Sequence, residues 1–350
     1  MMMRGILSIS LLWISALSSV TQAKSRFSVT EWKSTFSQAA QKNQTAEMQK
    51  LLDFAALESK ALPSCLDCET KKTLKRARQA FASGNLKQAE ALYSKIPKAS
   101  EMWLESVEEK GWAYFRLDDF ERTLAQTKTL LSPPFDVIVN SEAYFLQSLT
   151  QLKICDYEGV LKTHRKFKEA QRGRIQEMQS LSQTGRNQGL ETVLKKAQEF
   201  PLALTDFSDE LGKLPLQFYR DQQFQKWLLN YKLSESGLEV LPTEHSLRPA
   251  LKKRLDQARS QLQERLKVLA SRENQENSHI VKKLNLIEVE TLQRIHTDTQ
   301  LADQMYRSSD FKKVNEDQLI FMDDGYPWID EVDKYEVSAK SCAPGIRRKM

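Results

Sequence analysis

Apolar side chains recur every three or four positions along most of this chain, which is the spacing of one face of an α-helix. The breaks in the pattern fall near Gly and Pro, which number only 11 and 10 among 350 residues. The pattern predicts helices over 27–59, helix pairs over 70–170, shorter helices over 190–233 and a long helical stretch over 244–308. We therefore expect an all-α protein.

Within 70–170 the helical pattern returns at a fixed distance. Ala77, Ala80, Gly84, Leu86 and Ala89 recur 34 residues later as Gly111, Tyr114, Asp118, Phe120 and Thr123. A third copy follows with three residues added in the linker, most simply within 132–137, since Phe120 corresponds to Tyr157. Such a period is typical of helical repeats whose units bury their apolar faces only by stacking. The predicted helix pairs are 70–82 with 86–96, 101–117 with 120–131, and 140–154 with 157–170.

These repeats resemble the tetratricopeptide repeat (TPR) family over about 100 residues. The family's small residues are matched in the first helix of each pair by Ala77, Gly111 and Ser148, and in the second helix by Ala89, Thr123 and Val160. The family's large residues are matched by Tyr114 in a first helix and Tyr93 in a second helix. The equivalent positions in the other copies depart from the pattern: Ala80, Gln151, Thr127 and His164. The resemblance implies a right-handed α-solenoid of helical hairpins, here as an exported bacterial member. We expect Trp103, Trp112, Phe115, Tyr144 and Phe145 to fill the solenoid core rather than to bind a ligand.

A different pattern begins near residue 242. Leu251, Leu255, Ala258, Leu262, Leu266 and Leu269 step by three or four, and Ile280, Leu284, Ile287, Leu292 and Ile295 resume the seam after a polar interruption. This predicts either one long coiled-coil-like helix or a helical hairpin that folds at 274–278. The seam is covered either by this chain's own solenoid, which we favour, or by a partner helix through self-association.

The C-terminal tail contains two short strand candidates. Residues 318–322 are largely apolar, and Tyr335, Val337 and Ala339 alternate with polar residues. Pairing of the two segments predicts a small β-hairpin. The acidic set around Asp323, Asp324 and Gly325 lacks the ligand order of a calcium loop, so we interpret it as a solvated turn.

The N-terminus has the three parts of a secretory signal peptide. Arg4 is basic, residues 6–17 are mostly apolar, and Thr21 and Ala23 place small residues at the −3 and −1 positions of a cleavage site before Lys24. No cysteine follows the apolar run as a lipoprotein signal requires. We expect cleavage after Ala23 and a periplasmic or secreted protein without a stable membrane span; an uncleaved anchor is the alternative.

Export makes the four cysteines, Cys65, Cys68, Cys155 and Cys342, candidates for disulfides, with three possible pairings. We favour a small disulfide loop between Cys65 and Cys68. A thiol–disulfide redox site on the same two residues is the alternative, although no strand is predicted before them. Haem attachment is excluded because the residue after Cys68 is Glu69 rather than His.

The charge distribution and the motifs of the sequence do not indicate an enzyme. The net charge of +6 is spread along the chain, which disfavours nucleic acid as a partner. The sequence has no Gly-rich phosphate loop, no Gly-x-Ser-x-Gly elbow and no His-Glu-x-x-His helix. We predict no catalytic residue, cofactor or metal site.

The predicted function is therefore a non-enzymatic interaction scaffold of the cell envelope, in which the solenoid docks a peptide or helix of a protein partner. Candidate partner-binding residues on the inner face of the first helices are Lys110, Arg116 and Gln147. We divide the chain into a signal peptide (1–23), an N-terminal helical cap (24–69), TPR-like repeats (70–170), degenerate helical repeats (171–241), the long helix (242–309) and a tail (310–350).

Overall fold

The computed structural model describes residues 26–63, 67–297 and 334–339 and is built almost entirely of α-helices, which confirms the all-α class. The first part contains β1 (Phe27–Ser28), α1 (Val29–Gln41), α2 (Thr45–Leu51) and α3 (Phe54–Ala61). The repeat region contains α4 (Cys68–Ala82), α5 (Leu86–Tyr93), α6 (Trp103–Arg116), α7 (Phe120–Leu130), η1 (Pro133–Phe135), α8 (Ser141–Lys153) and α9 (Tyr157–Thr184). Then come α10 (Gln188–Lys196), β2 (Glu199–Phe200), η2 (Leu204–Lys213), η3 (Phe218–Arg220), α11 (Gln222–Val240) and α12 (Arg248–Thr297).

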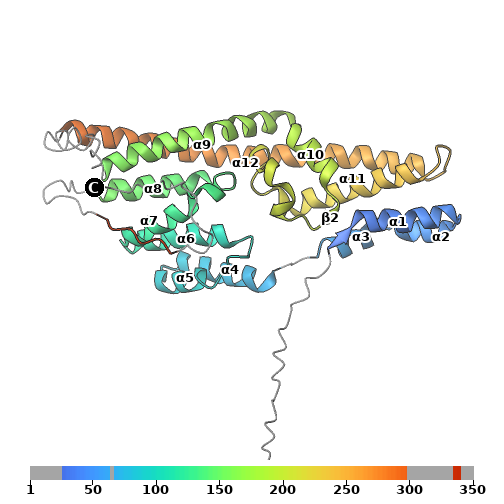
Figure 1. The fold of residues 1–350 in the computed structure, drawn as a ribbon, viewed down its shortest axis with the longest axis horizontal. Coiled ribbons are helices and arrows are strands. Elements are labelled where there is room, and N and C mark those ends of the chain that lie inside the picture. The colour runs from blue at the N-terminus through green and yellow to red at the C-terminus, as the bar shows by residue number, and fades with distance from the viewer. Residues whose placement is uncertain (1–25, 64–66, 298–333, 340–350) are drawn as a thin grey trace, which may run out of the picture.

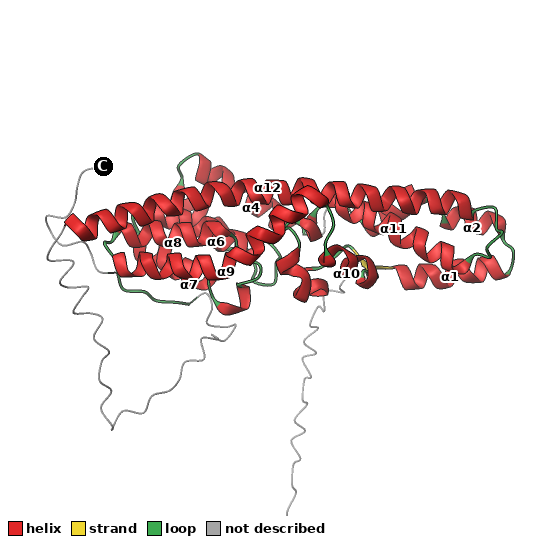
Figure 2. Ribbon diagram, turned by 90° about the horizontal axis from the view of Figure 1, so that it is seen from above, coloured by secondary structure: helices red, strands yellow, loops and turns green. Residues whose placement is uncertain are grey.

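The molecule is elongated, and α12 runs along its whole length (Figure 1). At one end α8 and α9 pack on α12, and the pairs α6–α7 and α4–α5 follow as further layers. At the other end α11 packs on α12, and α1 packs on α11. Seen from above (Figure 2), α12 is an uninterrupted rod that joins the two ends.

The three turns inside the helix pairs have one common geometry. Gly84, Asp118 and Cys155 each adopt a positive φ, of 80°, 58° and 63°. The next residue in each turn is Asn or Asp, and its side chain accepts a hydrogen bond from a backbone N–H in the first turn of the second helix. The turns therefore recur at the positions that the repeat pattern predicts.

Small residues let the helices of this region approach closely. Ala77 and Ala89 are fully buried. A methyl group placed on Gly111 would lie 2.9 Å from Cδ2 of Leu146 and 3.4 Å from Cβ of Gln126, so α6 meets both α7 and α8 at this glycine. The small positions matched in the sequence are thus sites of close helix packing.

The N-terminal helices share a core with the far half of the chain. Trp32 and Phe36 stack with ring centroids 5.0 Å apart and belong to a cluster with residues of α10, α11 and α12. We expected residues 24–69 to cap the repeats; the core of α1–α3 lies instead with α11. A two-residue antiparallel ladder, Phe27 opposite Phe200, fixes this arrangement and was not predicted.

The long helix α12 spans 50 residues without a break, so it is not a hairpin. Its seam from Leu251 to Ile287 is mostly buried against α11, α9 and α8, whereas Leu292 is 41% exposed. The polar patch at 274–278 does not interrupt the helix, and two of its asparagines hydrogen-bond to neighbouring helices. Ser141 Oγ donates to Asn277 Oδ1 at 2.7 Å, and Asn274 Nδ2 donates to the Met178 carbonyl at 2.9 Å.

Residues 334–339 lie along α7 and form no β-strand, which corrects the predicted pairing of Tyr335, Val337 and Ala339. The Lys128 ammonium lies 4.4 Å from the centroid of the Tyr335 ring, and the Ala339 N–H donates to Glu121 Oε1 at 3.0 Å. The other predicted strand, 318–322, and the acidic turn after it lie outside the described residues. This tail segment is therefore held by side chains of α7 rather than by a ladder.

Candidate functional site

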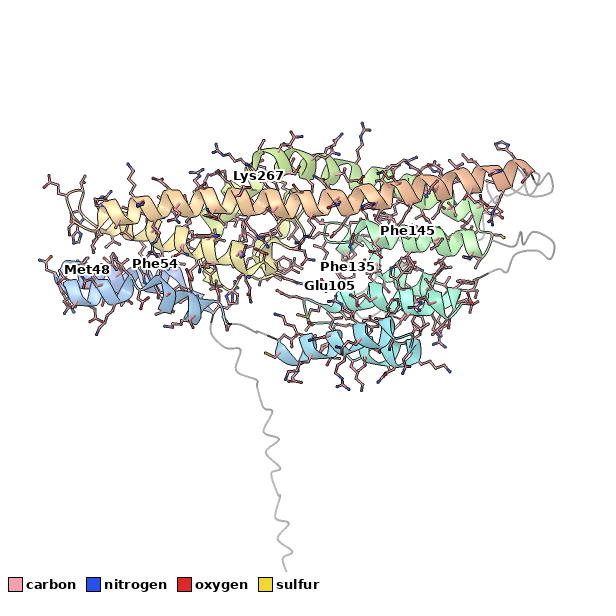
Figure 3. The ribbon with its side chains drawn as sticks, turned by 180° about the vertical axis from the view of Figure 1, so that it is seen from behind. Met48, Phe54, Glu105, Phe135, Phe145 and Lys267 are labelled. Atoms are coloured by element: carbon pink, nitrogen blue, oxygen red, sulfur yellow. The ribbon has the colours of Figure 1, made fainter. Side chains whose placement is uncertain are left out.

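A groove opens between α4, α6, α8 and α12, and the last residue of α5 also lines it. Its volume is about 550 Å³, and four of its lining residues are aromatic: Phe81, Tyr93, Trp112 and Phe145. The charged lining residues are Arg78, Glu108, Glu109, Glu142 and Lys283. We call this surface the inner groove. Figure 3 shows Phe145 on α8 beside α12, with Glu105 of α6 lying further from that helix.

Helical spacing brings these side chains to one face. Glu108 and Trp112 are four residues apart on α6, Arg78 precedes Phe81 by three on α4, and the same step separates the two α8 residues. The Trp112 and Phe145 rings have centroids 5.8 Å apart, so α6 and α8 share an aromatic wall. The indole N–H of Trp112 is buried and has no hydrogen-bond partner within the described chain.

Two of the acidic groups near the groove are paired with arginines. Arg78 donates to Glu109 from Nε at 2.9 Å and from Nη2 at 2.6 Å, and Nη2 also reaches Glu105 at 3.2 Å. Arg220 donates to the second oxygen of Glu105 at 2.7 Å. Hydrogen bonding to Glu109 raises the pKa of the Arg78 guanidinium above its ordinary value. These charges neutralise one another and tie α4, α6 and η3 together.

Glu108 has a different environment. Burial, reinforced by the negative charges of Glu142, Glu109 and Glu105, raises the pKa of the Glu108 carboxyl to about 8. Every charged neighbour that acts on it is another glutamate. The Glu108 side chain also lines a second cavity, of about 260 Å³, that reaches Asn140 and Tyr219. A carboxyl group without a hydrogen bond or ion pair from another described residue therefore lines the inner groove.

The three partner-binding residues expected from the sequence lie at different distances from this groove. Arg116 is at its edge: its guanidinium lies 4.9 Å from the centroid of the Phe81 ring, and Nη1 donates to the Phe81 carbonyl at 3.2 Å. Lys110 and Gln147 are half-buried and do not line it. Each follows a lining residue by two positions, which turns its side chain about 200° away around the helix.

Sequence reasoning missed the groove residues Glu108, Trp112 and Phe145. We expected the side chains of Trp112 and Phe145 in the core of the solenoid, whereas both are half-buried and line the groove. One signal was available. In the repeat register Glu108 occupies the position of Leu74 in the first pair and of Phe145 in the third, and Leu74 is buried. An acid at a position that is otherwise apolar in the repeats marks the groove.

Both cysteines that the structure describes, Cys68 and Cys155, are disulfide-bonded. Cys68 begins α4, and Cys155 is the left-handed residue of the turn before α9. Cys65 and Cys342 lie outside the described residues. No thiol is thus free in the described part of the chain.

His164 is a packed histidine. It is 2% exposed, its Nδ1 lies 3.4 Å from Glu288 Oε2, and burial lowers its pKa. Across the described ranges no group of His, Cys, Asp and Glu side chains is arranged to hold a metal ion. Nor does any described helix combine the length and apolar composition that a bilayer span requires.

Comparisons with protein-family models, with curated protein sequences and with solved structures found no match to this chain. The geometry of the inner groove is therefore the basis for a functional proposal.

Proposed function

We propose that this protein is a non-enzymatic, exported interaction scaffold that docks a peptide or helix of a cell-envelope partner in the inner groove. In this proposal α4–α5, α6–α7 and α8–α9 are three units of a TPR-like right-handed solenoid. The helix α12 acts as a coiled-coil-like brace across them. The shared turn geometry at Gly84, Asp118 and Cys155 supports the repeat assignment.

The observation that carries the docking function is the aromatic wall of the inner groove. Trp112 and Phe145 remain half-buried although the neighbouring Tyr144 is fully buried, so this wall is a surface left open by the packing of the helices. Aromatic side chains in a concave surface with a few polar groups are typical of ligand sites. They also contribute much of the binding energy at protein interfaces.

The proposed compartment is the periplasm or the exterior. The disulfides at Cys68 and Cys155 support it, because such bonds persist in oxidising environments. The signal-peptide pattern of residues 1–23 supports it independently. Fractionation of cells and mass spectrometry of the mature N-terminus test both points: recovery from the cytoplasm with residues 1–23 intact contradicts export.

Quantitative pull-down from envelope extract tests docking. We expect Trp112→Ala and Phe145→Ala to reduce capture of a specific partner by at least about tenfold, the effect of losing an interface hot spot. Glu158→Gln is a matched control, since Glu158 is exposed on α9 and pairs only with Lys162 among the described residues. Equal recovery by all variants, with unchanged melting temperatures, refutes docking in the inner groove.

Substitutions of the sequence-predicted residues give a second comparison. Arg116→Ala is expected to weaken capture, because Arg116 borders the inner groove at Phe81. Lys110→Ala and Gln147→Ala are expected to have smaller effects, because neither side chain lines the groove. A larger loss with Lys110→Ala or Gln147→Ala than with Trp112→Ala assigns docking to another face of the same helices.

The alternative function, a thiol–disulfide redox protein, requires a reactive Cys65–Cys68 pair. A thiol titre and a disulfide reductase assay, with and without Cys65→Ala, distinguish it from docking. Reductase activity that disappears in Cys65→Ala favours the alternative, and an inert oxidised pair favours the scaffold.

A further inference from the structure

The inner groove contains a carboxyl group, that of Glu108, to which no described residue donates a hydrogen bond or forms an ion pair. Glu105 and Glu109 are bound by Arg78 and Arg220, whereas Glu108 is surrounded by glutamates. A carboxylate in such surroundings is unfavourable until a cation reaches it. The described carboxylates do not converge on a metal-binding arrangement, so the expected cation belongs to an organic group.

The aromatic wall suits an organic cation. Two cations of the protein already lie over aromatic rings of the groove. Lys283 Nζ lies 5.0 Å from the centroid of the Phe145 ring, and the Arg116 guanidinium lies 4.9 Å from the centroid of the Phe81 ring. Trp112 lies on α6, between the helices that carry these two rings, and tryptophan is the strongest cation–π partner. A Lys or Arg stem can pack on the rings while its charged end reaches a carboxylate.

We propose that the inner groove binds a lysine or arginine side chain of the docked segment, with the charged end at Glu108 and Glu142 and the stem against Trp112. This inference rests on the proposed docking function and specifies its partner: a protein segment that presents a basic residue. Acidic segments are disfavoured, because a further carboxylate in the groove would be repelled by Glu109 and Glu142.

Selection of displayed random peptides on the intact, disulfide-bonded protein provides the probe. The enriched peptide is synthesised in three forms: as selected, with its basic residue replaced by norleucine, and with that residue replaced by glutamate. Isothermal titration measures each form against wild type, Glu108→Gln/Glu142→Gln and Glu158→Gln. Trp112→Ala serves to locate the peptide.

We expect enriched peptides to share a basic residue, and its replacement by norleucine to weaken binding at least about tenfold, as for loss of a charged hydrogen-bonding partner. The norleucine form is expected to bind wild type and Glu108→Gln/Glu142→Gln with equal affinity, because only the cation of the peptide interacts with the two carboxylates. Titrations near pH 7 in buffers of different ionisation enthalpy are expected to reveal proton release on binding, since the bound cation lowers the raised pKa of Glu108.

The opposite outcomes separate the two proposals. Peptides that lose affinity with Trp112→Ala but contain no basic residue, or that bind Glu108→Gln/Glu142→Gln unchanged, overturn the cation site and leave groove docking intact. An absence of enriched peptides, or peptides insensitive to Trp112→Ala, overturns docking in the groove and the cation site with it.

Discussion

Replacement of Glu108 by glutamine tests the electrostatics of the inner groove without any ligand. Glutamine has nearly the same shape as the neutral acid but cannot become charged. The pKa of Glu108 is raised from 4.5 to about 8 in the folded protein, so folding favours the neutral form. The stabilising contribution of this group is complete below about pH 4.5 and is lost as pH rises through about 8.

The size of the effect follows from that difference. One pKa unit corresponds to about 1.4 kcal/mol, so the full difference amounts to roughly 5 kcal/mol at high pH. The Glu108 side chain retains contact with water, and salt screens its glutamate neighbours. We therefore expect Glu108→Gln to be more stable than wild type by about 2 kcal/mol at pH 9 and to equal it near pH 4.5.

Urea denaturation at pH 4.5, 7 and 9, followed by tryptophan fluorescence, measures this difference. Glu158→Gln makes the same chemical change on an exposed turn of α9, and its difference from wild type is expected to vary far less with pH. A Glu108→Gln variant whose advantage does not grow with pH, or which is less stable than wild type at pH 9, refutes the account of an unmatched carboxyl.

Four further predictions concern α9, the residue that ends it and their surroundings. Gly185→Ala is expected to cost at least about 2 kcal/mol, because φ is 64° and a methyl group would lie 2.4 Å from a backbone carbonyl oxygen of α12. Gly173→Ala, inside α9 with open space around it, is expected to stabilise the protein by up to about 1 kcal/mol. Thermal melts measure both glycine substitutions. Arg174→Ala is expected to cost about 3 kcal/mol in chemical denaturation, because it leaves Glu273 and the carbonyls of Leu211 and Leu214 without their buried donor. A loss below about 1 kcal/mol contradicts this. The lowered pKa of His164 predicts a stability that is complete above about pH 6.5 and falls as pH drops below it; melting temperatures between pH 7.5 and 5 measure the fall, which His164→Gln should reduce.

The local structure of the repeats could be predicted because local signals determine it. The turns at Gly84, Asp118 and Cys155 lie where the recurring pattern ends one helix and begins the next. Each following Asn or Asp is a helix cap that functions with backbone atoms a few residues away. Such contacts are short-range, so the spacing in the sequence is sufficient to locate them.

Contacts between residues far apart in the sequence could not be predicted from the sequence pattern. The pairing of Phe27 with Phe200 joins residues 173 positions apart, and nothing near either residue indicates the other. The polar patch at Asn274 and Asn277 suggested a bend, but its hydrogen-bond partners come from α8 and α9. The candidate site was missed for a related reason: the repeat identifies the first helices, and only their packing decides that Glu108 rather than Lys110 enters the groove.

The continuity of α12 has a consequence for the order of folding. Its 50 residues span about 75 Å and complete the apolar cores at both ends of the molecule. A chain still under synthesis thus lacks the covering surface for α1, α11, α8 and α9 until residues near its C-terminus have been made. Contacts between residues far apart in the sequence, such as those of α12 with α8 and α9, form slowly during folding. We expect α8, α9 and α11 to remain protease-sensitive in nascent chains that lack α12, and both ends of the molecule to become protected together once it is present.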